Sequence, residues 1–182
     1  MIVLFEGVDG GGKTTLIKRL LETFPDAEEL EWPGRRDNPQ EFLESCKNFI
    51  EENKDKEDSG KLYFVDRCGL GEFMYGPLTK GREMSKISEY APIFQKWLKG
   101  KLLVLCINQD AHQLAVERGE DGPAKDKQFH NYVSAGYRVM GNGSGLHILG
   151  YNFKRDPEAY DNIVGAILAH RVIEVLQYDN SK

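Results

Sequence analysis

The chain has 182 residues, of which 40% are hydrophobic and 29% are charged, and its formal net charge is −5. This composition is typical of a globular protein with a core of its own and excludes a largely disordered chain. The acidic balance argues against broad, nonspecific binding of nucleic acid. The apolar runs are shorter than the ~18 residues that a membrane-spanning helix needs. We therefore expect one cytoplasmic domain over residues 1–182, without a membrane partner.

Short apolar runs alternate with helical patterns along the chain. This alternation predicts an α/β fold with a parallel sheet. Strands are expected over residues 2–6, 28–32, 62–66, 102–107 and 146–149. The run over 102–107 is apolar throughout, which is typical of a strand covered by helices on both faces.

Amphipathic helices are expected in the intervals between these strands, and their apolar stripes are predicted to face the core. One helix begins at Lys13, one at Asn38-Pro39 and one at Asp156-Pro157. In the two C-terminal helices the stripes consist of Phe129, Tyr132, Val133, Tyr137 and Met140, and of Tyr160, Ile163, Val164, Ile167, Leu168, Val172 and Val175. An apolar helix over 86–99, with an exposed-looking Trp97, forms a face for a homodimer or packs on the sheet.

The most specific motif lies between the first strand and the first helix. Residues 7–14, GVDGGGKT, fit the pattern G-x-x-x-x-G-K-[ST] without a mismatch. The glycines let backbone N–H groups surround a phosphate chain at the helix N-terminus. Lys13 would reach the β- and γ-phosphates, and the Thr14 hydroxyl would complete a magnesium shell. The predicted cofactors are ATP and Mg²⁺, and the motif does not distinguish ATP from GTP. The predicted donor site consists of Gly7, Val8, Asp9, Gly10, Gly11, Gly12, Lys13, Thr14 and Thr15.

Two further polar segments follow neighbouring strands. Asp66-Arg67 comes directly after the third strand, at the edge where α/β sheets bind ligands. Asp66 is predicted to hold magnesium through water, and Arg67 to meet a phosphate. Trp32-Pro33-Gly34-Arg35-Arg36 follows the second strand, and paired arginines suit phosphate because the guanidinium fork matches its oxygens. The loop over 117–127, rich in glycine and charge, is expected to close over phosphates.

Together these segments resemble the thymidylate kinase family of P-loop nucleotide kinases, with gaps across most of the chain. The resemblance implies a three-layer sandwich, a five-stranded parallel sheet with helices on both faces, and a short lid over about 118–128. It also implies that Asp9 touches the sugar of the acceptor, while Arg35 grips the acceptor's phosphate. Tyr75 would line the acceptor pocket.

The same resemblance indicates which residues form the lid. Residues 114–120, LAVERGE, followed by Phe129 and Tyr132, are similar to the lid of that family and the helix after it. Arg118, with Lys125 or Lys127, would then fold onto the transferring phosphoryl group. Tyr151 and Phe153 follow the last strand, where such enzymes often seat adenine, although core packing also explains both residues.

Three departures from the family pattern concern the acceptor side. Glu31 stands where members often carry an arginine, and Gly71 replaces a serine. The interval between Arg36 and Asp66 is short for the extra helix that usually holds the acceptor base. Because an acid can take a proton from a hydroxyl, Glu31 favours a hydroxyl acceptor. A solvated acid at a strand end explains it equally well.

Three functions therefore remain open. The first is phosphorylation of a thymidylate-like deoxypyrimidine nucleotide in nucleotide biosynthesis. The second is phosphorylation of a hydroxyl, in a pyrimidine nucleoside or in 5-hydroxymethyluracil within DNA, as phage members of the family perform in the host cytoplasm. A base within DNA would be flipped out, with Arg35, Arg36 and residues 80–82 on the backbone. The third is a nucleotide-dependent switch, because Asp66-x-x-Gly69 fits a GTPase signature, although residues 108–110 do not complete it.

Overall fold

The protein is described by a computed structural model that covers residues 1–34, 38–73, 75, 89–106, 111–119, 126–143, 147–152 and 156–179. Its centre is a five-stranded sheet in which every neighbouring pair is parallel, in the order β2-β3-β1-β4-β5. The strands are β1 (Ile2–Gly7), β2 (Glu28–Leu30), β3 (Tyr63–Asp66), β4 (Leu102–Cys106) and β5 (His147–Tyr151). The prediction of a parallel α/β sheet is confirmed.

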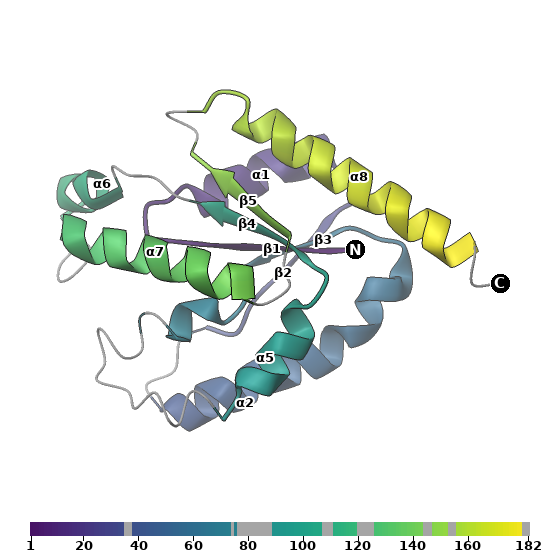
Figure 1. Ribbon diagram of the computed structural model, residues 1–182, viewed down its shortest axis with the longest axis horizontal. Coiled ribbons are helices and arrows are strands. Elements are labelled where there is room, and N and C mark those ends of the chain that lie inside the picture. Colours follow the sequence, from purple (N-terminus) through teal and green to yellow (C-terminus); the bar gives the residue numbers. More distant parts are fainter. Residues whose placement is uncertain are drawn as a thin grey trace.

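Helices cover both faces of the sheet, so the fold has three layers (Figure 1). The helical elements are α1 (Lys13–Thr23), α2 (Pro39–Asn53), η1 (Lys54–Ser59), α5 (Ala91–Leu98), α6 (Ala111–Glu117), α7 (Lys127–Gly143) and α8 (Ala159–Asp179). Helices α1 and α8 pack on one face, while α2, α5 and α7 pack on the other. Central strand β1 supplies alternate side chains to the two cores, Leu4 to one and Phe5 to the other.

Strand ends differ from the sequence prediction by one to two residues, for local reasons. Strand β2 ends at Leu30 instead of residue 32, because Trp32 turns into the core and Pro33 has no N–H to continue a ladder. Strand β5 runs on to Tyr151 because its pairing with β4 continues to Cys106. Helix α2 begins where expected, since the Asn38 side chain accepts a hydrogen bond of 2.9 Å from the Gln40 N–H.

The burial of several apolar side chains departs from the sequence prediction. Trp97 is 3% exposed and packs edge-on against Phe49, with 6.0 Å between ring centroids. The expectation of an exposed Trp97 was therefore wrong, and α5 packs on the sheet. Tyr132, Leu168 and Val172 are 69%, 50% and 58% exposed, although they were expected in the core. The apolar stripe that faces the core is therefore narrower on α7 and on α8 than the sequence predicted.

In the described part of the chain, no helix combines the length and the apolar character needed to cross a membrane. The three cysteines, Cys46, Cys68 and Cys106, are free and buried. Burial raises the pKa of the Cys46 and Cys106 thiols to about 12.

An aromatic cluster joins α2 and α5 to the turn that follows β3. Phe94 of α5 lies 6.4 Å from the ring of Trp32 and 5.6 Å from that of Phe73, between ring centroids. Gly69 of the turn has a left-handed φ of +86°, and a Cβ there would lie 2.3 Å from the Phe94 ring. The turn can thus pack against the cluster only because residue 69 has no side chain.

We predict that Gly69→Ala lowers the free energy of unfolding by about 2–4 kcal/mol, because left-handed strain and overpacking against Phe94 act together. Urea unfolding followed by tryptophan fluorescence measures the loss. The matched control is Gly60→Ala, since Gly60 has φ +73° but nothing within 4 Å of its added Cβ. In that control, the free energy of unfolding is expected to fall by about 1 kcal/mol. Equal losses in the two variants would contradict the packing argument.

Candidate functional site

Residues 7–14, Trp32-Pro33-Gly34 and Asp66-Arg67 meet at the carboxyl edge of the sheet, where parallel α/β folds bind ligands. A cleft of about 760 Å³ opens there, and we call it the sheet-edge cleft. Its lining comes from the ends of β1, β2 and β3 and from α2, and consists of Glu6, Asp9, Glu29, Leu30, Glu31, Trp32, Pro33, Gly34, Phe42, Asp66, Arg67, Gly69, Gly71, Glu72 and Tyr75.

The loop over residues 7–14, here called the phosphate loop, connects β1 to α1. At Gly7 the loop passes close to β4, since a Cβ there would lie 2.1 Å from the Cys106 carbonyl oxygen. Helix α1 then begins at Lys13, after Gly12 in a left-handed conformation. No side chain caps this helix within the described residues, and its first turn holds no acid. Its first N–H groups and the positive end of its dipole are therefore available to an anion.

Lys13 is folded back onto the phosphate loop. Its Nζ donates to the carbonyl oxygens of Gly7 at 3.1 Å and Val8 at 3.2 Å, and the residue is 7% exposed. Burial, followed by the positive charge of Arg67, lowers the pKa of Lys13 below its usual value. The two carbonyl contacts hold the ammonium group beside the loop, where the polyphosphate of a nucleotide would lie.

Thr14 and Asp66 come together although 52 positions separate them. The Thr14 Oγ1 donates to the Asp66 Oδ2 at 3.4 Å, while Asp66 Oδ1 is buried without a hydrogen-bond partner in the described structure. A hydroxyl and a carboxylate with a spare oxygen fit Mg²⁺, which prefers oxygen ligands. No cluster of three or more His, Cys, Asp or Glu able to hold a metal occurs among the described residues. A magnesium ion here would complete its shell with water and phosphate oxygens, which is typical for this ion.

Arg67 connects the phosphate loop to the sheet-edge cleft. Its Nη2 donates to the Asp9 Oδ1 at 2.7 Å, and both side chains are partly exposed. Burial alone would lower the pKa of Arg67, but the carboxylates of Glu6 and Asp9 raise it, so the guanidinium stays charged. Tyr75 completes this wall of the cleft and packs on Phe129 of α7, with 5.5 Å between ring centroids.

Glu6 belongs to the site but was not singled out as a site residue from the sequence. It lies in β1 and is fully buried, and its Oε1 accepts hydrogen bonds from the N–H of Cys68 at 3.0 Å and of Gly71 at 3.4 Å. A buried carboxylate is costly unless hydrogen bonds compensate for lost solvation. The signal in the sequence was an acid at the carboxyl end of an otherwise apolar strand.

The remaining predicted site residues fall into four groups. Glu31 and Trp32 line the sheet-edge cleft. Arg118 directly follows α6 and is exposed, and it does not line the cleft. Tyr151 is buried in the core between the sheet and α8, which fits core packing. Outside the described residues lie Arg35, Arg36, Lys125, Phe153, residues 80–82 and most of the predicted lid.

Two solved structures are similar to this chain over nearly their whole length. One is the YorR protein from Bacillus subtilis in complex with phosphorylated GDP, with a TM-score of 0.66 and 15% identity, covering 93% of this chain and 98% of that chain. The other is thymidylate kinase from Ehrlichia chaffeensis, with a TM-score of 0.61 and 14% identity, covering 92% of this chain and 98% of that chain. The chain has a P-loop kinase fold.

Comparison by sequence finds a match to only part of the chain. The family model described as the viral superfamily 1 RNA helicase core domain matches residues 3–80, which is less than half of the chain. This segment begins in β1 and includes the phosphate loop and Asp66-Arg67. No curated protein sequence matches the chain.

We predict that Asp66→Asn weakens Mg²⁺-dependent nucleotide binding by roughly tenfold or more, because an amide cannot supply the anionic oxygen that the ion prefers. Calorimetry with ATP in Mg²⁺ and in EDTA measures the difference. The control is Asp26→Asn, because Asp26 pairs with Arg171 at the surface, 3.0 Å apart. A Mg²⁺ dependence that survives Asp66→Asn would remove Asp66 from the metal site.

Proposed function

We propose that this protein is a Mg-ATP-dependent kinase that transfers the γ-phosphate to a thymidylate-like deoxypyrimidine nucleotide. The observation that carries the proposal is the direct contact between the phosphate loop and the sheet-edge cleft. Asp9 of the loop pairs with Arg67 of the cleft. A donor phosphate on the loop and an acceptor in the cleft would therefore lie side by side. The fold shared with a thymidylate kinase supports the proposal.

On the donor side the protein positions phosphates and neutralises charge. The amides of the phosphate loop and the first turn of α1 bind the phosphate chain, and Lys13 exchanges the carbonyls of Gly7 and Val8 for phosphate oxygens. Thr14 and Asp66 would hold magnesium, which neutralises charge on the transferring group. Phosphoryl transfer requires little covalent chemistry from the protein, so alignment of the two substrates accounts for most of the catalysis.

On the acceptor side Arg67, Asp9 and Tyr75 would bind the nucleotide. The guanidinium fork of Arg67 suits a phosphate, and the Asp9 carboxylate can accept a hydrogen bond from a sugar hydroxyl. A phosphomonoester is already ionised at neutral pH, so its oxygen attacks without a general base. Arg118, at the start of the predicted lid, would stabilise the transferring phosphoryl group.

A second candidate is a kinase for a hydroxyl group, such as that of 5-hydroxymethyluracil within DNA. The observation that favours it is the charge of the sheet-edge cleft. Its described lining includes one basic residue, Arg67, and the six acids Glu6, Asp9, Glu29, Glu31, Asp66 and Glu72. The hydroxyl of a base or nucleoside is itself uncharged, so it meets less repulsion from these acids than a phosphate dianion would. Glu31 is exposed in the cleft and could take the proton of that hydroxyl.

The two candidates are separated by one transfer assay. We predict that, with Mg²⁺ and γ-labelled ATP or GTP, label passes to dTMP, and that Lys13→Ala reduces the rate by at least ~10²-fold. Thymidine and DNA containing 5-hydroxymethyluracil are the competing acceptors. Label found only in the DNA or the nucleoside would replace the first candidate with the second. Slow release of free phosphate with all three acceptors would indicate a nucleotide switch.

Glu31 gives an independent prediction on the same question. With a phosphate acceptor, Glu31→Gln is expected to change kcat less than about threefold, because no proton has to be removed. With a hydroxyl acceptor, the same change is expected to lower kcat by ~10²-fold or more. Glu29→Gln is the matched control, since Glu29 also lines the cleft and lies only two residues earlier. Equal losses from both changes would point to the overall charge of the cleft and not to a base.

A further inference from the structure

The turn after β3 carries Arg67 in a conformation that has to be held from outside. Arg67 has a φ of +84°, and it is the one non-glycine residue with left-handed backbone in the part of the chain that the structure describes. Such a backbone is unfavourable for a residue with a Cβ, and it persists only where the surroundings fix it. The direction of the Arg67 side chain depends on this backbone.

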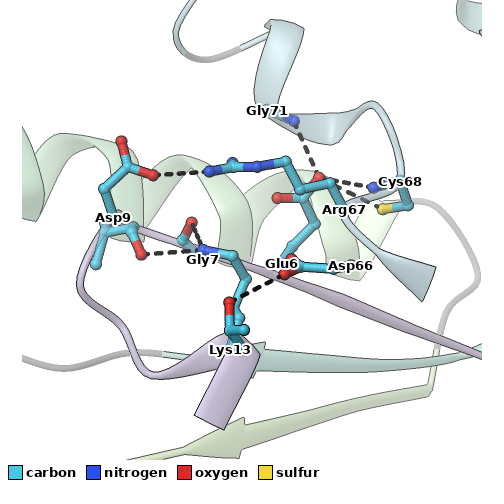
Figure 2. A network of polar contacts seen from close by, with 10 residues as sticks. Glu6, Gly7, Asp9, Lys13, Asp66, Arg67, Cys68 and Gly71 are labelled. Carbon is cyan, nitrogen blue, oxygen red and sulfur yellow. Dashed lines mark hydrogen bonds and ion pairs between the residues drawn. The ribbon is translucent and has the colours of Figure 1, made fainter. Parts of the chain in front are cut away.

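Strand β1 supplies the restraints on this turn. The Arg67 N–H donates to the Phe5 carbonyl oxygen at 2.8 Å, and the next N–H, that of Cys68, donates to the Glu6 Oε1 at 3.0 Å. The Gly71 N–H reaches the same oxygen at 3.4 Å, so one carboxylate oxygen spans the turn (Figure 2). Two neighbouring residues of β1 thus hold consecutive amides on the two sides of the left-handed residue.

Glu6 also lies beside Arg67 and α7. Burial, followed by the Glu6 carboxylate, raises the pKa of the Tyr137 phenol of α7 well above its usual value. A Cβ at Gly71 would lie 3.1 Å from the Tyr137 hydroxyl and 3.9 Å from both the Arg67 Nη1 and the Glu6 Oε1. The carboxylate, the guanidinium and the phenol therefore surround one small space at the base of the sheet-edge cleft.

We propose that Glu6 is a positioning residue that holds the left-handed turn at Arg67 and thereby directs the guanidinium into the sheet-edge cleft. Glu6 acts through Arg67 and is not required to touch the acceptor. The inference rests on the proposed function for the identity of the acceptor. The restraint on the turn is independent of the acceptor and is measured without it.

Two substitutions separate the reach of Glu6 from its charge. Glu6→Gln keeps an oxygen at the same distance and removes the charge, whereas Glu6→Asp keeps the charge and shortens the side chain by ~1.5 Å. Glu6→Leu removes both the hydrogen-bonding oxygen and the charge, and leucine is a good apolar replacement for a buried acid. Cys68→Ala is the control, because it removes the Sγ that lies 3.7 Å from the Glu6 Oε1 and leaves the N–H in place.

The first measurement uses the free protein. NMR hydrogen exchange at the amides of Cys68 and Gly71 is expected to quicken by roughly tenfold or more in Glu6→Asp and Glu6→Leu, and to stay near wild type in Glu6→Gln and Cys68→Ala. The Arg67 guanidinium N–H signal is expected to broaden in the same two variants. Unchanged exchange in Glu6→Asp would overturn the inference whether or not the protein is active, including the case in which Glu6→Leu fails to fold.

The second measurement uses the acceptor that the transfer assay identifies. Glu6→Asp is expected to raise the KM for the acceptor about tenfold while the Kd for Mg·ATP changes less than about twofold. The charge at position 6 is kept, and the hydrogen bonds of Lys13 and Thr14 go to Gly7, Val8 and Asp66 and not to Glu6. In an Arg67→Ala background, Glu6→Asp is expected to raise the KM for the acceptor by less than about a further twofold. The reason is that both substitutions act through the side chain of Arg67. Additive effects would overturn the inference. A wild-type protein that phosphorylates no acceptor would refute the proposed function and leave the exchange result to decide the role of Glu6.

Discussion

The parallel pairing of β1 with β3 on one side and β4 on the other determines where the phosphate loop and Asp66-Arg67 lie. Register brings Phe5 opposite Asp66 and Gly7 opposite Cys106, so the phosphate loop begins between the ends of two buried strands. Because all five strands run the same way, their carboxyl ends meet at one edge, and the side chains that follow them share one cleft. Close approach of the Cys106 carbonyl to Gly7 leaves no room for a side chain, so the loop can turn into α1 only with glycine there.

Charge balance within this edge follows from the same arrangement. Two cations, Lys13 and Arg67, lie among the carboxylates of Glu6, Asp9 and Asp66, and each cation contacts the protein itself. Incoming phosphates would therefore exchange partners with groups that are already ordered, which limits the entropy lost on binding. The other lining residues of the cleft are mostly acidic or apolar. The excess of acids is the reason why a hydroxyl acceptor is proposed as the second candidate beside a nucleotide monophosphate.

The supporting layers have unequal roles. Helices α2 and α5 bring Trp32, Phe49, Phe94 and Trp97 into one aromatic cluster, which packs against the turn after β3. This cluster fixes one wall of the cleft through buried apolar contact. On the outer sides of α7 and α8, in contrast, Tyr132, Leu168 and Val172 are exposed and add little to the core. The similarity in fold to YorR and to a thymidylate kinase at 14–15% identity fits a framework set by packing of layers and not by individual outer residues.

The amino-acid sequence by itself determined the local elements: the alternation of strands and helices, the phosphate loop, and the Asn38-Pro39 start of α2. Each of these depends on hydrogen bonds, periodicity or backbone freedom within a few residues of the chain. It did not reveal that Trp97 is buried, that Arg67 pairs with Asp9, or that Glu6 holds the turn after β3. Those facts depend on contacts between residues tens of positions apart, such as Glu6 and Cys68, and a single sequence carries no record of which distant groups meet. Only the tertiary structure decided them, because only the packing of strands and helices brings such groups within hydrogen-bond distance.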